Sequence, residues 1–192
     1  MMTPEEHKAR TARSYKLLLI FAMISMTMMF AGLTSALVVS KSRPDWLTNF
    51  QLPSSFTYSL FTILLCSVTF HLAKRAIKND DRKRTTTFLL TTLLLGLTFV
   101  FFQLQGFSQL FESHLYPVGG SGSITISFLY VLVYLHLAHL SGGVISLLII
   151  IYNHFKQKYN ASQFLGIELG AMYWHFLDFL WVYLFLFLYF FK

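Results

Sequence analysis

The chain has 192 residues, of which 55% are hydrophobic and only 12% are charged, about half the charged share of an average soluble domain. This composition argues against a water-soluble enzyme and predicts an all-α, polytopic membrane helix bundle with little material outside the bilayer. The net charge of +7 does not indicate nucleic-acid binding, because the basic residues lie in the connections between apolar runs. The single cysteine, Cys66, excludes an intramolecular disulfide.

Five apolar runs, each long enough to cross a membrane, follow one another in a single transmembrane domain that spans residues 1–192. The predicted helices cover about residues 15–40, 56–76, 87–110, 124–152 and 166–191. The first run is too long for the apolar part of a secretory signal, so it is expected to be retained as a helix.

Lysine and arginine are unevenly distributed over the connections. With the N-terminus inside, twelve of the 15 basic residues fall on the inner side and three on the outer side. Because inner segments of membrane proteins carry the excess of positive charge, the sequence predicts a cytoplasmic N-terminus and a C-terminus outside.

The run from Tyr173 to Trp181 places His175 and Asp178 within an apolar helix. A charged carboxylate in hydrocarbon costs at least ~2.5 to 3.5 kcal/mol, so Asp178 is expected to be paired or functional. His136 and His139 of the fourth helix fall at similar depth, and each pair shares one helix face. We therefore expect one polar cluster, in which Asp178 hydrogen-bonds to the fourth helix or to His175.

Such a cluster is compatible with several roles. Interhelical hydrogen bonding is the simplest interpretation. Two histidines with a nearby acid could also hold zinc, iron or copper, a bis-histidine haem is a related alternative, and a proton or lipid-headgroup role is another. Trp174 and Trp181 suit helix packing or a lipid cleft, and Gly142 and Gly143 indicate close packing of helices. Since the sequence lacks a redox ligand set, we expect this chain to bind no haem.

The last apolar run carries a long and specific motif. Tyr173-Trp174-His175-Phe176-Leu177-Asp178, continuing to Trp181, resembles the last-helix signature Tyr-Trp-His-Phe-x-Asp-x-x-Trp of subunit III of the haem-copper terminal oxidases. His136-Leu137-Ala138-His139, followed by glycine, is similar to the family's His-x-x-His pattern. Further agreement comes from Leu52-Pro53, Ser67-Val68-Thr69 with Ala73, and Phe102-Gln103 with Gln105. Five helices resemble the short bacterial form of this subunit.

This resemblance implies an accessory subunit of a cytochrome c oxidase-type complex in the bacterial inner membrane. Haem and copper are expected in partner subunits, with subunit I in direct contact and with subunit II, other small subunits and a respiratory supercomplex as further partners. The chain itself is expected to have no catalytic, cofactor-binding or metal residues, and to support assembly, phospholipid binding in a cleft and sustained proton uptake during O2 reduction to water. The motifs assign a structural or lipid-binding role to His136, His139, Tyr173, Trp174, His175, Asp178 and Trp181.

One position departs from the family pattern. The first helix of the family usually has a buried glutamate after a serine, but here Met26 follows Ser25, so no role of that acid is expected. A subunit III of a quinol oxidase and an accessory subunit of nitric oxide reductase are alternatives with the same fold. An independent membrane carrier or proton pathway is an alternative of another class, although the sequence shows no inverted repeat and no broken helices.

Overall fold

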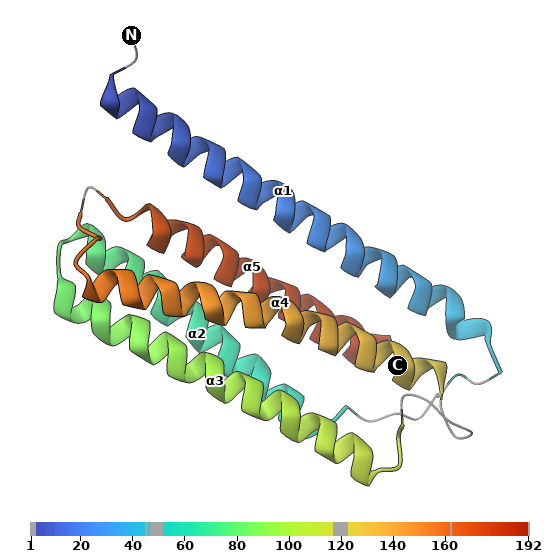
Figure 1. Ribbon diagram of the computed structural model, residues 1–192. Coiled ribbons are helices and arrows are strands. Elements are labelled where there is room, and N and C mark those ends of the chain that lie inside the picture. Colours follow the sequence, from blue (N-terminus) through green and yellow to red (C-terminus); the bar gives the residue numbers. More distant parts are fainter. Residues whose placement is uncertain (1–2, 45, 47–51, 117–122, 162, 192) are drawn as a thin grey trace.

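The computed structural model describes residues 3–44, 46, 52–116, 123–161 and 163–191 (Figure 1). These residues form five long α-helices and a short 3-10 turn, Ser40–Ser42, which follows the first helix. The helices are α1 (Pro4–Val39), α2 (Ser54–Lys78), α3 (Arg82–Glu112), α4 (Ile124–Phe155) and α5 (Leu165–Phe190). Each contains an apolar stretch long enough to cross a membrane, which confirms the predicted fold class of a five-helix bundle.

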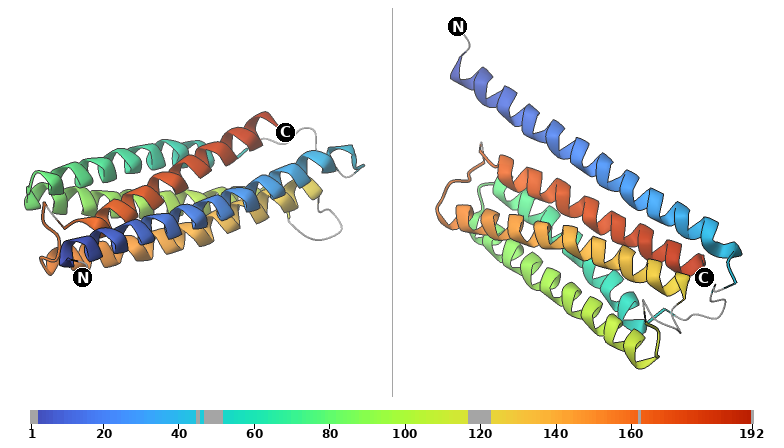
Figure 2. Two further views of the ribbon diagram at one scale, coloured as in Figure 1. Left: turned by 90° about the horizontal axis from the view of Figure 1, so that it is seen from above. Right: turned by 45° about the vertical axis from the view of Figure 1, so that its right-hand side comes forward.

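Helices α2 to α5 form the compact part of the bundle, and α1 lies against α4 and α5 (Figures 1 and 2). The N-terminal half of α1 diverges from the other helices, as both figures show. Between residues 5 and 29 no side chain of α1 is buried, whereas Phe30, Thr34 and Leu37 in its second half are buried. Helix α1 is therefore fixed to the bundle mainly by its C-terminal half.

The N-terminus of α1 lies eleven residues before the predicted start at residue 15. A capping box fixes this end: the Thr3 hydroxyl accepts a hydrogen bond from the Glu6 backbone N–H, and the Glu6 carboxylate accepts one from the Thr3 backbone N–H. The prediction was wrong here because an apolar run marks the part of a helix inside hydrocarbon, and a charged segment with good helix formers extends the helix beyond it. The 36 residues of α1 span about 54 Å.

Aromatic side chains fill the centre of the bundle. Trp181 of α5 contacts Phe56 of α2 and Phe99 of α3 edge to face, with ring centroids 5.9 and 5.4 Å apart. Seven residues earlier on α5, the Trp174 ring contacts Phe70 of α2, with ring centroids 6.0 Å apart. Edge-to-face contacts between fully buried rings add to the energy of burial itself. The tryptophans of the motif thus join α5 to α2 and α3.

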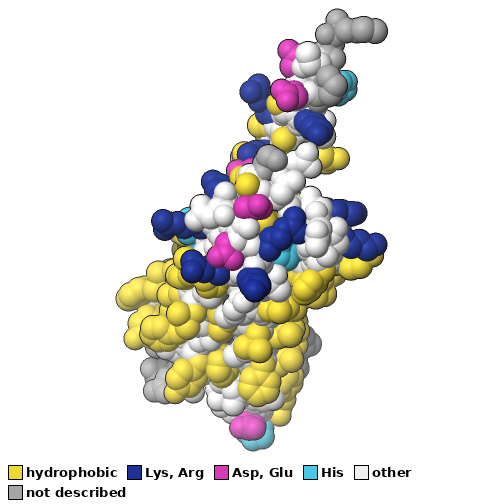
Figure 3. All heavy atoms as spheres, turned by 90° about the vertical axis from the view of Figure 1, so that its left-hand side faces the viewer, with side chains coloured by type: hydrophobic (Ala, Val, Ile, Leu, Met, Phe, Trp, Pro, Cys, Tyr) yellow, Lys and Arg dark blue, Asp and Glu magenta, His cyan; other side chains and the backbone are white. Residues whose placement is uncertain are grey.

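Basic residues gather at one end of the bundle, where the α2–α3 and α4–α5 connections and the first half of α1 lie (Figure 3). We call this the basic end. It contains Lys8, Arg10, Arg13, Lys16, Lys74, Arg75, Lys78, Arg82, Lys83, Arg84, Lys156 and Lys158.

Candidate functional site at the α4–α5 interface

Helices α4 and α5 approach closely at Gly143. A Cβ atom at this position would lie 2.9 Å from Cδ1 of Leu177 and 3.5 Å from the Trp174 ring. On the other side of Trp174, a Cβ at Gly96 of α3 would lie 3.1 Å from the same indole. The glycines therefore leave the space that the motif tryptophan occupies, which agrees with the packing role predicted for Gly143. Gly142 is exposed, and a Cβ there would lie 3.7 Å from the Tyr173 hydroxyl oxygen.

His136 is fully buried on α4. Its ring lies against Trp181, with centroids 5.1 Å apart, and meets the edge of Phe99 at 5.9 Å. Neither ring nitrogen has a hydrogen-bond partner among the described residues. His136 is thus held by aromatic rings, and nothing joins it to Asp178 by a hydrogen bond.

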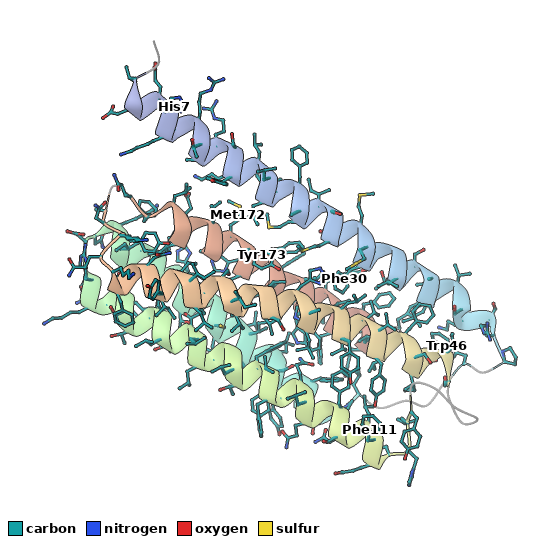
Figure 4. The ribbon with its side chains drawn as sticks, viewed as in Figure 1. His7, Phe30, Trp46, Phe111, Met172 and Tyr173 are labelled. Atoms are coloured by element: carbon teal, nitrogen blue, oxygen red, sulfur yellow. The ribbon has the colours of Figure 1, made fainter. Side chains whose placement is uncertain are left out.

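His139, one turn further along α4, links three helices. Its Nδ1–H donates to the Leu135 carbonyl at 2.7 Å, and its ring meets the edge of Phe30 of α1 at 5.8 Å. The hydroxyl of Tyr173 on α5 donates to the His139 carbonyl at 3.0 Å. Figure 4 shows Phe30 and Tyr173 in this region between α1 and the bundle. Tyr173 and His139 therefore join α5 to α4, and the histidine takes part through its backbone carbonyl.

His175 belongs to a different interface. Its Nδ1 and the Ser67 hydroxyl of α2 hydrogen-bond at 2.7 Å, and its ring centroid lies 6.2 Å from that of His71, also on α2. The single cluster predicted for His136, His139, His175 and Asp178 is therefore divided between two interfaces. The reason is helix rotation: Trp174 and Trp181 occupy the centre of the bundle, so His175 faces α2 rather than α4.

Asp178 is 3% exposed, so its side chain does not face lipid. Neither carboxyl oxygen has a hydrogen-bond partner among the described residues. The predicted hydrogen bond to α4 or to His175 is therefore wrong. Cys66 and Ser67 of α2 lie near Asp178.

The structure adds polar contacts that the sequence reasoning did not identify. The Gln103 amide of α3 donates to the Ser59 hydroxyl of α2 at 3.0 Å, and Thr69 and Thr92 join the same two helices at 2.9 Å. Serine and threonine inside apolar helices indicate hydrogen bonds between helices, but the partner of each side chain depends on helix rotation. Met26, at the family's glutamate position, is half-buried on α1.

The residues of the candidate site do not assemble the metal site considered from the sequence. Among the described residues, no group of three or more His, Cys, Asp or Glu side chains lies close enough to share an ion. His136 is enclosed by aromatic rings, and the Nδ1 of His139 is used by a backbone carbonyl. That this chain binds no haem stays a prediction.

A second candidate site lies at the basic end, between α1 and α5. Lys16 of α1 and Glu168 of α5 form an ion pair at 2.8 Å, and Lys74 of α2 lies 3.9 Å from the same carboxylate. Beside this bridge a cleft of about 630 Å³ opens between the first turns of α1 and the α4–α5 connection. Its charged and polar lining includes His7, Lys8, Lys158 and Gln163.

A narrower, apolar cleft of about 320 Å³ continues from this region toward the middle of the bundle. Tyr159 and Gly166 line both clefts. The lining of the narrower one comes from α1, α4 and α5 and consists of Tyr15, Leu19, Ser146, Ile149, Ile150, Tyr159, Gly166, Leu169, Gly170 and Tyr173. Burial raises the pKa of the Tyr159 hydroxyl, so it is a neutral donor at physiological pH.

The fold and these sites define a polytopic helical membrane protein whose last helix joins three others through one aromatic and polar motif. Comparison with known proteins specifies the class further. Residues 3–192 match the family described as cytochrome c oxidase subunit III. The chain therefore belongs to the cytochrome c oxidase subunit III family.

Two relatives illustrate the similarity. The probable quinol oxidase subunit 3 of Staphylococcus aureus (strain USA300) is 34% identical over 139 residues, which cover 71% of this chain and 66% of that protein. The cytochrome c oxidase subunit 3 of Papio hamadryas is 34% identical over 129 residues, which cover 67% of this chain and 47% of that protein. The matched part is thus less than two thirds of either relative.

Proposed function

We propose that this chain is the accessory, non-redox subunit III of a haem-copper terminal oxidase in an aerobic respiratory chain. The family match over residues 3–192 carries this proposal. The motif residues support it, because Tyr173, Trp174, His175 and Trp181 are all used to pack or bond helices. In this role the chain assists assembly and sustains proton uptake by the catalytic subunit, while haem and copper belong to partner subunits.

The electron donor of the complex is proposed to be either a quinol or cytochrome c. Both kinds of relative match at the same identity of 34%. The donor binds elsewhere in the complex, so nothing in this subunit selects between them.

Phospholipid binding is proposed for the two clefts between α1 and the α4–α5 region. The wider cleft has the cationic groups of Lys8 and Lys158 at its rim, which suit a lipid phosphate. The narrower, apolar cleft leads toward the middle of the bundle and suits an acyl chain. One lipid with its headgroup at the rim and a chain along Leu19 and Ile149 would contact both α1 and α4.

The distribution of positive charge supports an orientation of the protein in the membrane. The basic end carries most of the lysine and arginine residues of the chain, as Figure 3 shows. We place this end on the cytoplasmic side of a bacterial inner membrane, with the C-terminus of α5 on the opposite side.

A turnover experiment tests the accessory role. Membranes from a strain lacking this chain are compared with complemented membranes for O2 consumption over prolonged turnover. The proposal predicts that the initial rate per haem is largely retained without the chain, and that activity then decays much sooner. An unchanged decay, or an oxidase with no change in amount or activity, would contradict it.

A further inference from the structure

Polar side chains line the junction of α2 and α5 on the outer surface of the bundle. Ser67, His71 and Lys74 lie along one side of α2, and Glu168 and His175 lie along the facing side of α5. We call these five residues the α2–α5 seam. His71 is exposed, and the other four are half-buried. The seam thus opens on the surface of the protein rather than into its core.

The seam reaches well into the membrane. Glu168 lies in the first turn of α5, and His175 follows seven residues later, about 10 Å deeper along the helix. The Lys16–Glu168 ion pair closes the seam at the basic end. His71 and His175 therefore lie below the level of the charged groups.

Other outward faces at this depth are mainly apolar, and the exposed Thr91 of α3 donates its hydroxyl to the Thr87 carbonyl of its own helix. Helix α3 exposes Leu90, Leu94 and Leu97, and α4 exposes Ile145 and Leu148. Those faces suit acyl chains. Imidazoles in contact with acyl chains lose hydrogen bonds with water and gain none, so intramembrane polar groups normally face protein or a water-filled space.

The charges of the seam indicate which chemistry would cover it. Lys74 is a cation and each imidazole has an N–H that can donate, whereas the one carboxylate, Glu168, is already shared between Lys16 and Lys74. Ser67 and His175 satisfy each other through one ring nitrogen. A partner that offers a hydrogen-bond acceptor would therefore complement the seam. A lipid phosphate stays at the headgroup level and does not reach His175, whereas a transmembrane helix does.

We propose that the α2–α5 seam is the surface that docks a transmembrane helix of the catalytic oxidase subunit, with a carboxylate or amide carbonyl of that helix facing His71 and His175. This inference rests on the proposed function, because it assumes a catalytic partner. Beyond that function, it specifies which face of this chain the partner contacts and which type of group the partner presents.

Site-specific photo-crosslinking tests the docking face. Benzoylphenylalanine replaces Val68 of α2, which is 56% exposed and one turn before His71, or Leu94 of α3, which is 65% exposed. The two positions lie at similar distances from the basic end, so Leu94 is a matched control. In native membranes we expect the Val68 position to form an adduct with the haem-containing subunit severalfold more efficiently than the Leu94 position. Equal adducts at both positions, or lipid adducts alone at Val68, would overturn the inference.

A second pair of variants tests the chemistry. His71→Leu removes the exposed imidazole, and His71→Gln keeps a hydrogen-bonding group. We expect His71→Leu to lower the haem that co-purifies per chain severalfold, and His71→Gln to retain most of it, with both variants present in membranes at the normal amount. Full retention by His71→Leu contradicts the proposed contact.

Different results would contradict the proposed function and the proposed docking face. If the unaltered chain brings down no haem-containing subunit, the proposed function itself fails. If it does so and Val68 forms no adduct with that subunit, only the docking face is wrong.

Discussion

The hydroxyl of Tyr173 donates a 3.0 Å hydrogen bond to the backbone carbonyl of His139. The bond ties α5 to α4 within the apolar part of the bundle, at the level where Phe30 of α1 meets the His139 ring. It therefore lies where three helices meet. The histidine takes part through its backbone, so the contact depends on the placement of α4 as much as on residue type.

Removing this hydroxyl tests the contact. Tyr173→Phe should lower the free energy of unfolding by about 0.5 to 1.5 kcal/mol, because the ring stays and one interhelical hydrogen bond is lost. Reversible unfolding in mixed detergent micelles measures the change. Tyr58→Phe is the control, since Tyr58 is an exposed residue on α2, and it should have no measurable effect. Equal effects of both substitutions would show that the Tyr173 bond contributes nothing.

The space at Gly143 provides a second test. Gly143→Ala places a Cβ 2.9 Å from Cδ1 of Leu177, and the fully buried Leu177 side chain must shift, which should cost about 1 to 3 kcal/mol. Gly32→Ala on α1 is the matched control, because a Cβ there meets no other atom within 4 Å. The control should be neutral or should stabilise by up to about 1 kcal/mol, since alanine favours helix more than glycine does. A stable Gly143→Ala variant would contradict the described packing of α4 on α5.

The Lys16–Glu168 ion pair holds the first half of α1 near α5. The pair is partly exposed, so its contribution to stability should be small, about 0 to 1 kcal/mol. Its effect on the position of α1 should be larger, because no side chain between residues 5 and 29 is buried. Spin labels at Ser14 and Gln163 should report a longer and broader distance in Glu168→Lys. The exchange Lys16→Glu with Glu168→Lys, made together with Lys74→Gln to remove the second cation beside position 168, should restore the original distance. Failure to restore it would show that the pair does not position α1.

The proposed lipid site predicts a charge-dependent change in bound lipid. Lys158→Glu reverses a charge at the rim of the wider cleft, and should reduce the anionic phospholipid that remains bound through purification. Lys83→Glu is the control, because Lys83 lies at the basic end on α3 and does not line this cleft. Native mass spectrometry of the purified complex counts the bound lipids. The same number of bound lipids in both variants would contradict phospholipid binding in this cleft.

The number and order of the helices were predictable, because each apolar run is long and is bounded by connections that are charged or contain proline and glycine. The start of α1 was not, since the segment from Thr3 to Arg13 has charged residues and still continues the helix. Hydropathy reports the length of chain in hydrocarbon, whereas a cap such as Thr3 with Glu6 reports the end of the helix. The capping residues were present in the sequence and carried the missing signal.

The sequence placed the polar residues of the candidate site along their helices, but it did not predict which neighbouring helix each one faces. The motif placed His136, His139, His175 and Asp178 at similar depth, yet the structure assigns His175 to α2 through Ser67 and leaves His136 between Trp181 and Phe99. Depth follows from position along a helix. The neighbour that a side chain meets follows from the rotation of the helix, which is set here by the two tryptophans in the core.

Co-purification tests whether this chain is a subunit of a haem-containing oxidase. A tagged chain is extracted in mild detergent, its partners are identified by mass spectrometry, and the optical spectrum of the preparation is recorded. We expect a larger partner subunit with a haem spectrum, together with a copper-containing subunit. A chain that purifies alone, intact and colourless would not be such a subunit, and the buried histidine and aspartate residues would then require testing as a transport or proton pathway.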